Sequence, residues 1–125
     1  MSYTVKTIDE LESIHHGAVK LAGAELGIQS FGMQVLDFPA GFSEYPEHDH
    51  AEDGQEEVYV VLDGRADFVI DGEEVTISPG QLLKVDAASR RTLRPVEQGV
   101  RILAIGCTPA RAYERPQAFQ IGLRA

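Results

Sequence analysis

The sequence predicts an all-β domain, a sandwich or barrel, preceded by a short helical segment. From Phe31 onward, apolar residues alternate with a period of two, which is the side-chain period of a β-strand. These runs are rich in Val, Ile, Tyr and Phe and end at turn signals such as Asp63-Gly64 and Asp71-Gly72. A turn recurs about every ten residues, a spacing that is typical of sandwiches and barrels.

The first thirty residues predict two short helical pieces. Thr7 followed three residues later by Glu10 is the pattern of a capping box, so a helix is expected over about 8–16. A second helical piece is expected over 19–26, where Gly27 ends it. The chain is therefore divided into a helical extension (1–30), a barrel (31–106) and a C-terminal tail (107–125).

The barrel is expected to consist of short strands joined by tight turns. The segment 42–50 is extended, and Pro46 places it at an edge or a bulge. The other predicted strands are 31–38, 57–64, 66–71, 73–77, 82–85 and 100–106. Residues 58–62 are apolar on both faces, so both faces should be covered, and a homodimer is expected. The tail is expected to wrap the outside, to pair at an edge, or to cap the barrel.

Size and composition limit the functional classes. With 125 residues and 43% hydrophobic content, the chain is expected to form one globular domain. Its net charge of −9 argues against binding to nucleic acid or to an anionic membrane surface. No apolar run approaches the ~20 residues that span a bilayer. The single cysteine, Cys107, cannot form an intramolecular disulfide, which favours a cytoplasmic protein.

The stretch 48–64 contains the residues with the clearest chemistry. His48 and His50 are one residue apart, so on an extended strand they point the same way. Glu57 begins the next strand and can face them across the pair. Two imidazoles and one carboxylate form a plausible divalent-metal site with open positions. The other histidines, His15 and His16, have no such partners and are interpreted as surface residues.

The same stretch resembles a known motif. Gly41, His48, His50, Glu57 and Gly64 match the first motif of the cupins, specifically of the small single-domain kind. Six residues separate Glu57 from Gly64, as in the motif, and this gap selects Glu57 rather than its neighbour. The loop between His50 and Glu57 is also six residues, longer than usual. The resemblance implies a double-stranded β-helix, or jelly-roll barrel, that is often dimeric and usually holds a metal with three histidines and one glutamate.

The second cupin motif is degraded in this chain. The residues aligned with it are Gly80, Gln81, Asp86, Ala88 and, at the histidine position, Arg91. Arginine stays protonated and has no free lone pair, so it cannot replace a histidine ligand. Alternation puts Arg91 on the same face as Leu93, which is expected inside the barrel. A dication and a guanidinium about 5 Å apart repel by roughly 7 kcal/mol at an effective dielectric constant of ~20.

Three interpretations follow. In the first, His48, His50 and Glu57 bind a divalent ion (Fe, Mn, Ni, Zn or Cu) and Arg91 orients a small anionic ligand for oxygenation, isomerisation or hydrolysis. In the second, no metal binds, Arg91 pairs with Glu57, and the pocket holds a small molecule. In the third, the histidines are ordinary polar residues and the protein acts by assembly. Gln55 and Tyr59 are further candidates for contact with the ligand.

Overall fold

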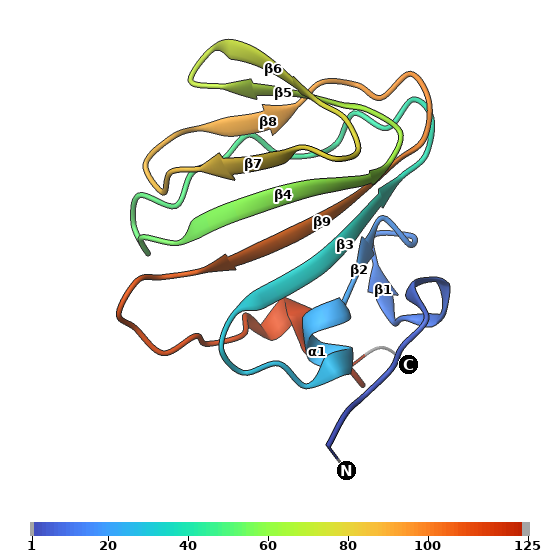
Figure 1. The fold of residues 1–125 in the computed structure, drawn as a ribbon, viewed down its shortest axis with the longest axis vertical. Helices are drawn as coiled ribbons and strands as arrows, with labels where there is room; N and C mark the ends of the chain where they lie inside the picture. Colours follow the sequence, from blue (N-terminus) through green and yellow to red (C-terminus); the bar gives the residue numbers. More distant parts are fainter. Residues whose placement is uncertain (1, 124–125) are drawn as a thin grey trace.

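Two antiparallel sheets form the protein (Figure 1). The computed structural model describes residues 2–123. The larger sheet has the strand order β1-β2-β3-β9-β4-β7, and the smaller sheet has the order β6-β5-β8. The strands are β1 Ser13–Ile14, β2 Val19–Lys20, β3 Gly32–Phe38, β4 Glu56–Asp63, β5 Ala66–Ile70, β6 Glu73–Ile77, β7 Leu82–Val85, β8 Arg91–Leu93 and β9 Val100–Cys107. The helical elements are α1 Ala22–Leu26 and two 3₁₀ turns, Ile8–Glu10 and Gln117–Phe119. The predicted all-β fold with a short N-terminal helical segment is confirmed.

The core lies between the two sheets. Alternate residues of β4 and β9 point into it, and Tyr59 and Ile102 have no exposed surface. From the smaller sheet, Phe68 packs its ring 4.8 Å from the ring of Tyr59. The opposite side of the larger sheet is partly covered by the N-terminal region, because Leu11 and Ala22 pack on Val35. Strand alternation thus gives this sheet two apolar faces, as the sequence predicts.

The predicted helix over 8–16 is wrong. The chain makes only a 3₁₀ turn there and then a hairpin of β1 and β2, and Thr7 makes no side-chain capping bond. A helix this short is costly to nucleate, whereas β2 gains a backbone ladder by pairing with the edge of β3. The second predicted piece is shorter than expected but ends where predicted, at Gly27, which has a left-handed φ of 72°.

Two irregular segments enclose one side of the larger sheet. The predicted extended segment 42–50 runs along β8, to which it is joined by the backbone bridge between His48 and Arg91. The C-terminal tail returns beside α1, and its short 3₁₀ helix, Gln117–Phe119, lies below β3 in the view of Figure 1. Residues 124–125 of the predicted tail lie outside the described residues. Within 2–123, none of the helices has the length and apolar character needed to cross a bilayer.

Two hairpin glycines with the same backbone conformation provide a stability prediction. Gly64 and Gly72 have φ of 85° and 83°. A Cβ at Gly64 would lie 2.5 Å from the backbone oxygen of Gly99, whereas a Cβ at Gly72 would meet nothing within 4 Å. Gly72→Ala should therefore cost only the left-handed strain of about 1–2 kcal/mol. Gly64→Ala should cost roughly 1–3 kcal/mol more, because backbone must shift. Urea unfolding of both variants measures the difference, and equal losses would contradict the steric argument.

Candidate metal centre

Backbone pairing fixes the two histidines of the 48–64 stretch. His48 and Arg91 exchange hydrogen bonds, with N–O distances of 3.0 and 2.8 Å, and the His50 N–H donates to the Ala87 oxygen at 2.7 Å. The segment is therefore held in an extended form, and the two imidazoles point to the same side, as predicted. Their ring centroids lie 5.2 Å apart. The extended segment thus presents both rings to one point in space.

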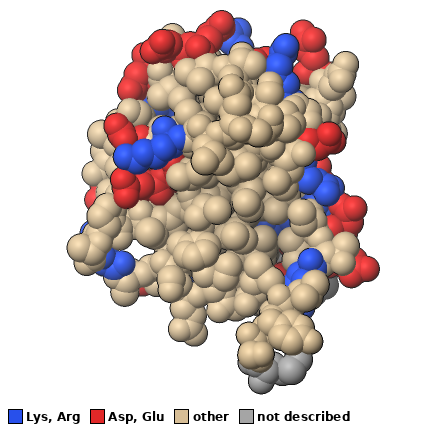
Figure 2. All heavy atoms as spheres, in the orientation of Figure 1, with Lys and Arg blue, Asp and Glu red and all other residues tan. Residues whose placement is uncertain are grey.

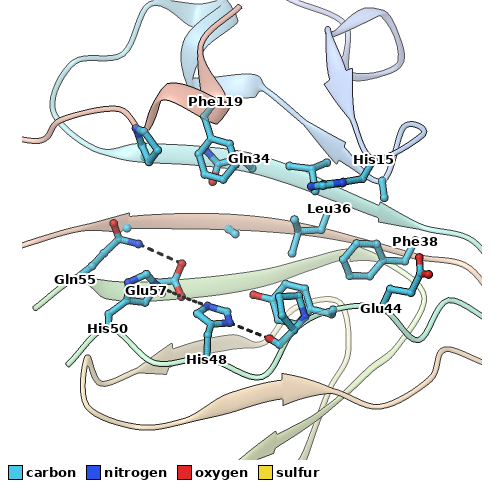
Figure 3. Close-up of a pocket in the computed structure, with 18 of the residues that line it drawn as sticks. His15, Gln34, Leu36, Phe38, Glu44, His48, His50, Gln55, Glu57 and Phe119 are labelled. Carbon is cyan, nitrogen blue, oxygen red and sulfur yellow. Dashed lines mark hydrogen bonds and ion pairs between the residues drawn. The ribbon is translucent and has the colours of Figure 1, made fainter. Parts of the chain in front are cut away.

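Glu57 meets the histidines from the neighbouring strand (Figure 3). It lies near the start of β4, where its side chain is 13% exposed, while Glu56 points outward. The Oε1 atom of Glu57 is 3.3 Å from Nε2 of His50 and 3.9 Å from Nε2 of His48. One ligand atom from each of the three residues falls within a 4.8 Å cluster. The sequence-derived group that could hold a metal is thereby confirmed.

The remaining imidazole nitrogens are held so that Nε2 of each ring is free for a metal. Nδ1 of His48 donates to the backbone oxygen of Pro46 at 2.9 Å, and Nδ1 of His50 donates to the Asp53 carboxylate at 3.2 Å. Neither acceptor oxygen carries a proton, so the proton of each hydrogen bond must come from Nδ1 of the ring. A neutral ring that is protonated on Nδ1 has a lone pair on Nε2. Metal-binding histidines are commonly oriented in this way. The donor set therefore fits a divalent ion.

The Glu57 carboxylate is held from two further directions. The Tyr59 hydroxyl donates to Oε1 at 2.8 Å, and the amide Nε2 of Gln55 donates to Oε2 at 3.3 Å. Burial favours the neutral carboxyl. The interactions with His48 and Tyr59 and the charges of His50 and Arg91 nevertheless hold the pKa of Glu57 below its ordinary value. Glu57 is thus kept ionised, as a metal ligand must be.

The Glu57 carboxylate also raises the pKa values of two neighbouring groups, His48 and Tyr59. Its interaction with His48 raises the pKa of that imidazole above the ordinary value, against the effect of burial. Burial and the nearby negative charge also raise the pKa of the Tyr59 hydroxyl. Tyr59 therefore remains a protonated donor.

Arg91 lies beside Glu57 but has no exposed surface. Its Nε is 3.9 Å from Oε1 of Glu57, and Nη2 donates to the backbone oxygen of Asp86 at 3.1 Å. Nε and Nη1 have no hydrogen-bond partner. Arg91 therefore faces inward as alternation predicts. Both Arg91 and Tyr59 are 0% exposed, and neither lines the cavity described below, so a contact of either side chain with a ligand stays a prediction.

A cavity of about 530 Å³ opens beside the three candidate ligands (Figure 3). Gln55 lines it, as predicted, together with His48, His50 and Glu57. Its size lies within the range of small-molecule sites. Several other lining residues come from distant parts of the chain, including the tail, for which capping the barrel was one of the alternatives expected from the sequence. They are His15, Glu44, Tyr113, Pro116 and Phe119.

The comparisons with known proteins agree with this geometry. A family model described as "Cupin domain" matches residues 34–106, which is more than half of the chain. The chain belongs to the cupin family. A solved cupin protein from Bacteroides fragilis is similar over 93% of this cupin and 92% of its own length, with a TM-score of 0.67 and 18% identity. The jelly-roll fold implied by the sequence resemblance is confirmed.

Other solved structures share the fold but belong to proteins of different kinds, a lyase and a transcriptional regulator. The DMSP lyase DddQ from Ruegeria pomeroyi matches with a TM-score of 0.56 and 24% identity, over 68% of this cupin and 42% of the lyase chain. The cupin domain of an XRE family transcriptional regulator from Enterobacter cloacae matches with a TM-score of 0.55 and 21% identity, over 66% and 86% of the two chains. No curated protein matches this sequence. At these identities, the likeness concerns the fold alone.

Proposed function

We propose that this cupin binds one divalent metal ion through His48, His50 and Glu57 and uses it to bind a small organic ligand in the adjacent cavity. The observation that carries the proposal is the orientation of the two imidazoles, which are held through Nδ1 so that Nε2 of each faces the carboxylate. The expected metals are Fe, Mn, Ni, Zn and Cu, which imidazole and carboxylate ligands accept.

The chain's own residues would prepare the centre for chemistry. Bound at this centre, a divalent ion would supply Lewis acidity to an oxygen atom of the ligand. Tyr59 and Gln55 hold the carboxylate of Glu57, and Asp53 holds His50. The reaction class we propose is oxygenation, isomerisation or hydrolysis of a small oxygen-bearing ligand. The similarity of fold to both a lyase and a regulator's domain is compatible with an enzyme or with a sensor.

Elemental analysis of untagged protein tests the metal proposal. Near-stoichiometric Fe, Mn, Ni, Zn or Cu is expected, and His50→Ala should lower the bound metal at least tenfold because one of three ligands is lost. His16→Ala is the matched control, since His16 is exposed and does not line the cavity. Protein that purifies without metal, and gains no thermal stability from any of these ions, would rule the proposal out.

A metal-free binding protein is the second candidate function. The observation that favours it is the position of Arg91, whose charge lies 3.9 Å from Glu57 and can compensate the carboxylate without a metal. In that case the cavity would bind its ligand directly. The elemental analysis above separates the two candidates.

We further propose that the protein is a homodimer formed through the outer face of the larger sheet. This face carries five apolar side chains at its centre, Val58, Val60, Leu62, Leu82 and Ile105. Leu82 is 76% exposed. Figure 2 shows that the middle of this side is free of Lys, Arg, Asp and Glu, which gather around its edge. Since each chain has a net charge of −9, this uncharged face is where a second copy meets the least repulsion.

A further inference from the structure

The wall of the cavity beside Glu57 is built from very small residues. In the larger sheet, Glu57 pairs with Gly106, which in turn pairs with Gly32. The inward residues of β9 become smaller toward this row, from Ile102 through Ala104 to Gly106. The glycines leave room for other side chains of the cavity wall, because a Cβ at Gly106 would lie 2.9 Å from the Gln55 amide nitrogen.

The C-terminal tail forms the other wall. Tyr113 occupies the space over Gly32, where a Cβ would lie 2.9 Å from the tyrosine hydroxyl. Arg115 anchors the tail by donating from Nη2 to the backbone oxygens of Gly23 and Ile28. Phe119 then projects into the cavity opposite the histidines (Figure 3). The wall is tied to the N-terminal region at Arg115 and again at Gly122, whose backbone N–H donates to the Glu12 carboxylate at 2.9 Å.

The part of the cavity away from the metal ligands is lined mainly by apolar and aromatic side chains, with His15, Gln34 and Glu44 beside them (Figure 3). Leu36 and Phe38 line it from β3, and Phe42 stacks on Phe38 with ring centroids 4.2 Å apart. Phe119 faces this surface from the tail (Figure 3). The distance along β3 from Gly32 to Phe38 is roughly 20 Å at 3.3 Å per residue. A ligand that reaches from the metal into this space must carry an apolar body.

The charges around the cavity restrict the ligand further. Among the described lining residues, Glu44, Asp53 and Glu57 are acidic and none is Lys or Arg. Arg91 is close but fully buried behind Glu57. An anionic group can therefore be compensated at the metal, whereas a second anionic group elsewhere in the cavity would face carboxylates without a cation.

From these observations we propose a ligand class for this cavity, an inference that rests on the proposed metal function. The ligand has one oxygen-donor head group that binds the metal and one uncharged aromatic or branched aliphatic body. The body packs between Phe119 and the wall formed by Leu36 and Phe38. Phosphorylated molecules with a second anionic group do not fit this description, because that group would face the lining carboxylates without a cation.

Two hydroxamates with the same head group test the inference. Acetohydroxamic acid and 3-phenylpropionohydroxamic acid are titrated calorimetrically into the metal-loaded protein. The phenyl compound should bind at least tenfold more tightly, because its ring is buried against the aromatic wall. Phe119→Ala should reduce this ratio below threefold. Ile121→Ala, a change at a partly exposed residue of the same tail that does not line the cavity, should leave the ratio unchanged.

The possible outcomes separate this inference from the proposal on which it rests. Metal uptake with equal affinity for the two hydroxamates, or with no hydroxamate binding, overturns the ligand class alone. A ratio that Phe119→Ala does not change also overturns it, provided that circular dichroism shows the variant to be folded. Failure to take up any metal overturns the metal function and, with it, this inference.

Discussion

Arg91→Met should lower the free energy of unfolding of the metal-free protein by roughly 3–5 kcal/mol, the usual cost of removing one partner of a buried ion pair. Arg91 is completely buried, and its Nε lies 3.9 Å from the Glu57 carboxylate, which is itself only 13% exposed. Methionine preserves much of the side-chain volume but leaves the negative charge with less compensation. The loss should shrink when a divalent ion saturates the site, because the ion then compensates Glu57. Urea unfolding with and without metal measures both values.

Two variants make this result specific. The double variant Arg91→Met/Glu57→Gln should recover much of the stability, since it removes both charges of the pair. Arg90→Met is the matched control. The Arg90 side chain is 55% exposed and pairs with Glu47 at the surface, so its replacement should cost no more than about 1 kcal/mol. If Arg91→Met costs as little as the control, Arg91 does not compensate Glu57.

The same variant tests how the arginine acts on the metal. Removing a positive charge next to the site should tighten divalent-metal binding at least tenfold, because the repulsion between the two cations disappears. Competition with a metal indicator dye measures the change. Weaker metal binding in Arg91→Met would instead indicate that Arg91 is needed to position Glu57.

The strands of the barrel could be predicted from the sequence because each one is defined by local information. The apolar alternation of 73–77 and 82–85 is bounded by turn residues, and the predicted limits match β6 and β7. The failure at 8–16 has a different origin. The hairpin there depends on pairing with β3, whose residues Val35 and Leu36 are far away in the sequence, so local signals favoured a helix.

The candidate site shows the same division. His48, His50 and Glu57 could be predicted because the histidine spacing and the following strand place them together locally. The opposite wall could be predicted only as one of several alternatives for the tail, because Phe119 reaches the cavity through a long irregular return of the chain. Arg91 was correctly expected to face inward. Its complete burial depends on how closely the segment around His48 packs on β8. The alternation of apolar residues predicts which face a side chain is on, but not how much of it is covered.

Val60→Glu should convert the proposed dimer into a monomer. Val60 lies near the centre of the outer apolar face, where it pairs with Leu82 on one side and Leu103 on the other. Because a two-fold dimer places each face against its own copy, the substitution puts two carboxylates near the same axis. Like charges opposed across an interface cost several kcal/mol, and each carboxylate must also lose its water. Light scattering should therefore give about twice 13.7 kDa for the wild type and 13.7 kDa for the variant.

The controls for this prediction distinguish a disrupted interface from a disrupted fold. Val5→Glu makes the same chemical change at a residue that is 81% exposed and lies before the first described turn, so it should leave the dimer intact. Leu82→Glu attacks the same face at a side chain that is 76% exposed, so it should produce monomers with little loss of stability. A wild-type monomer at tens of micromolar, or a dimer that survives both Val60→Glu and Leu82→Glu, would show that this face is not the interface. The apolar residues of 58–62 would then lack the partner that their two-faced pattern predicts, and the exposed face would be a site for a different protein.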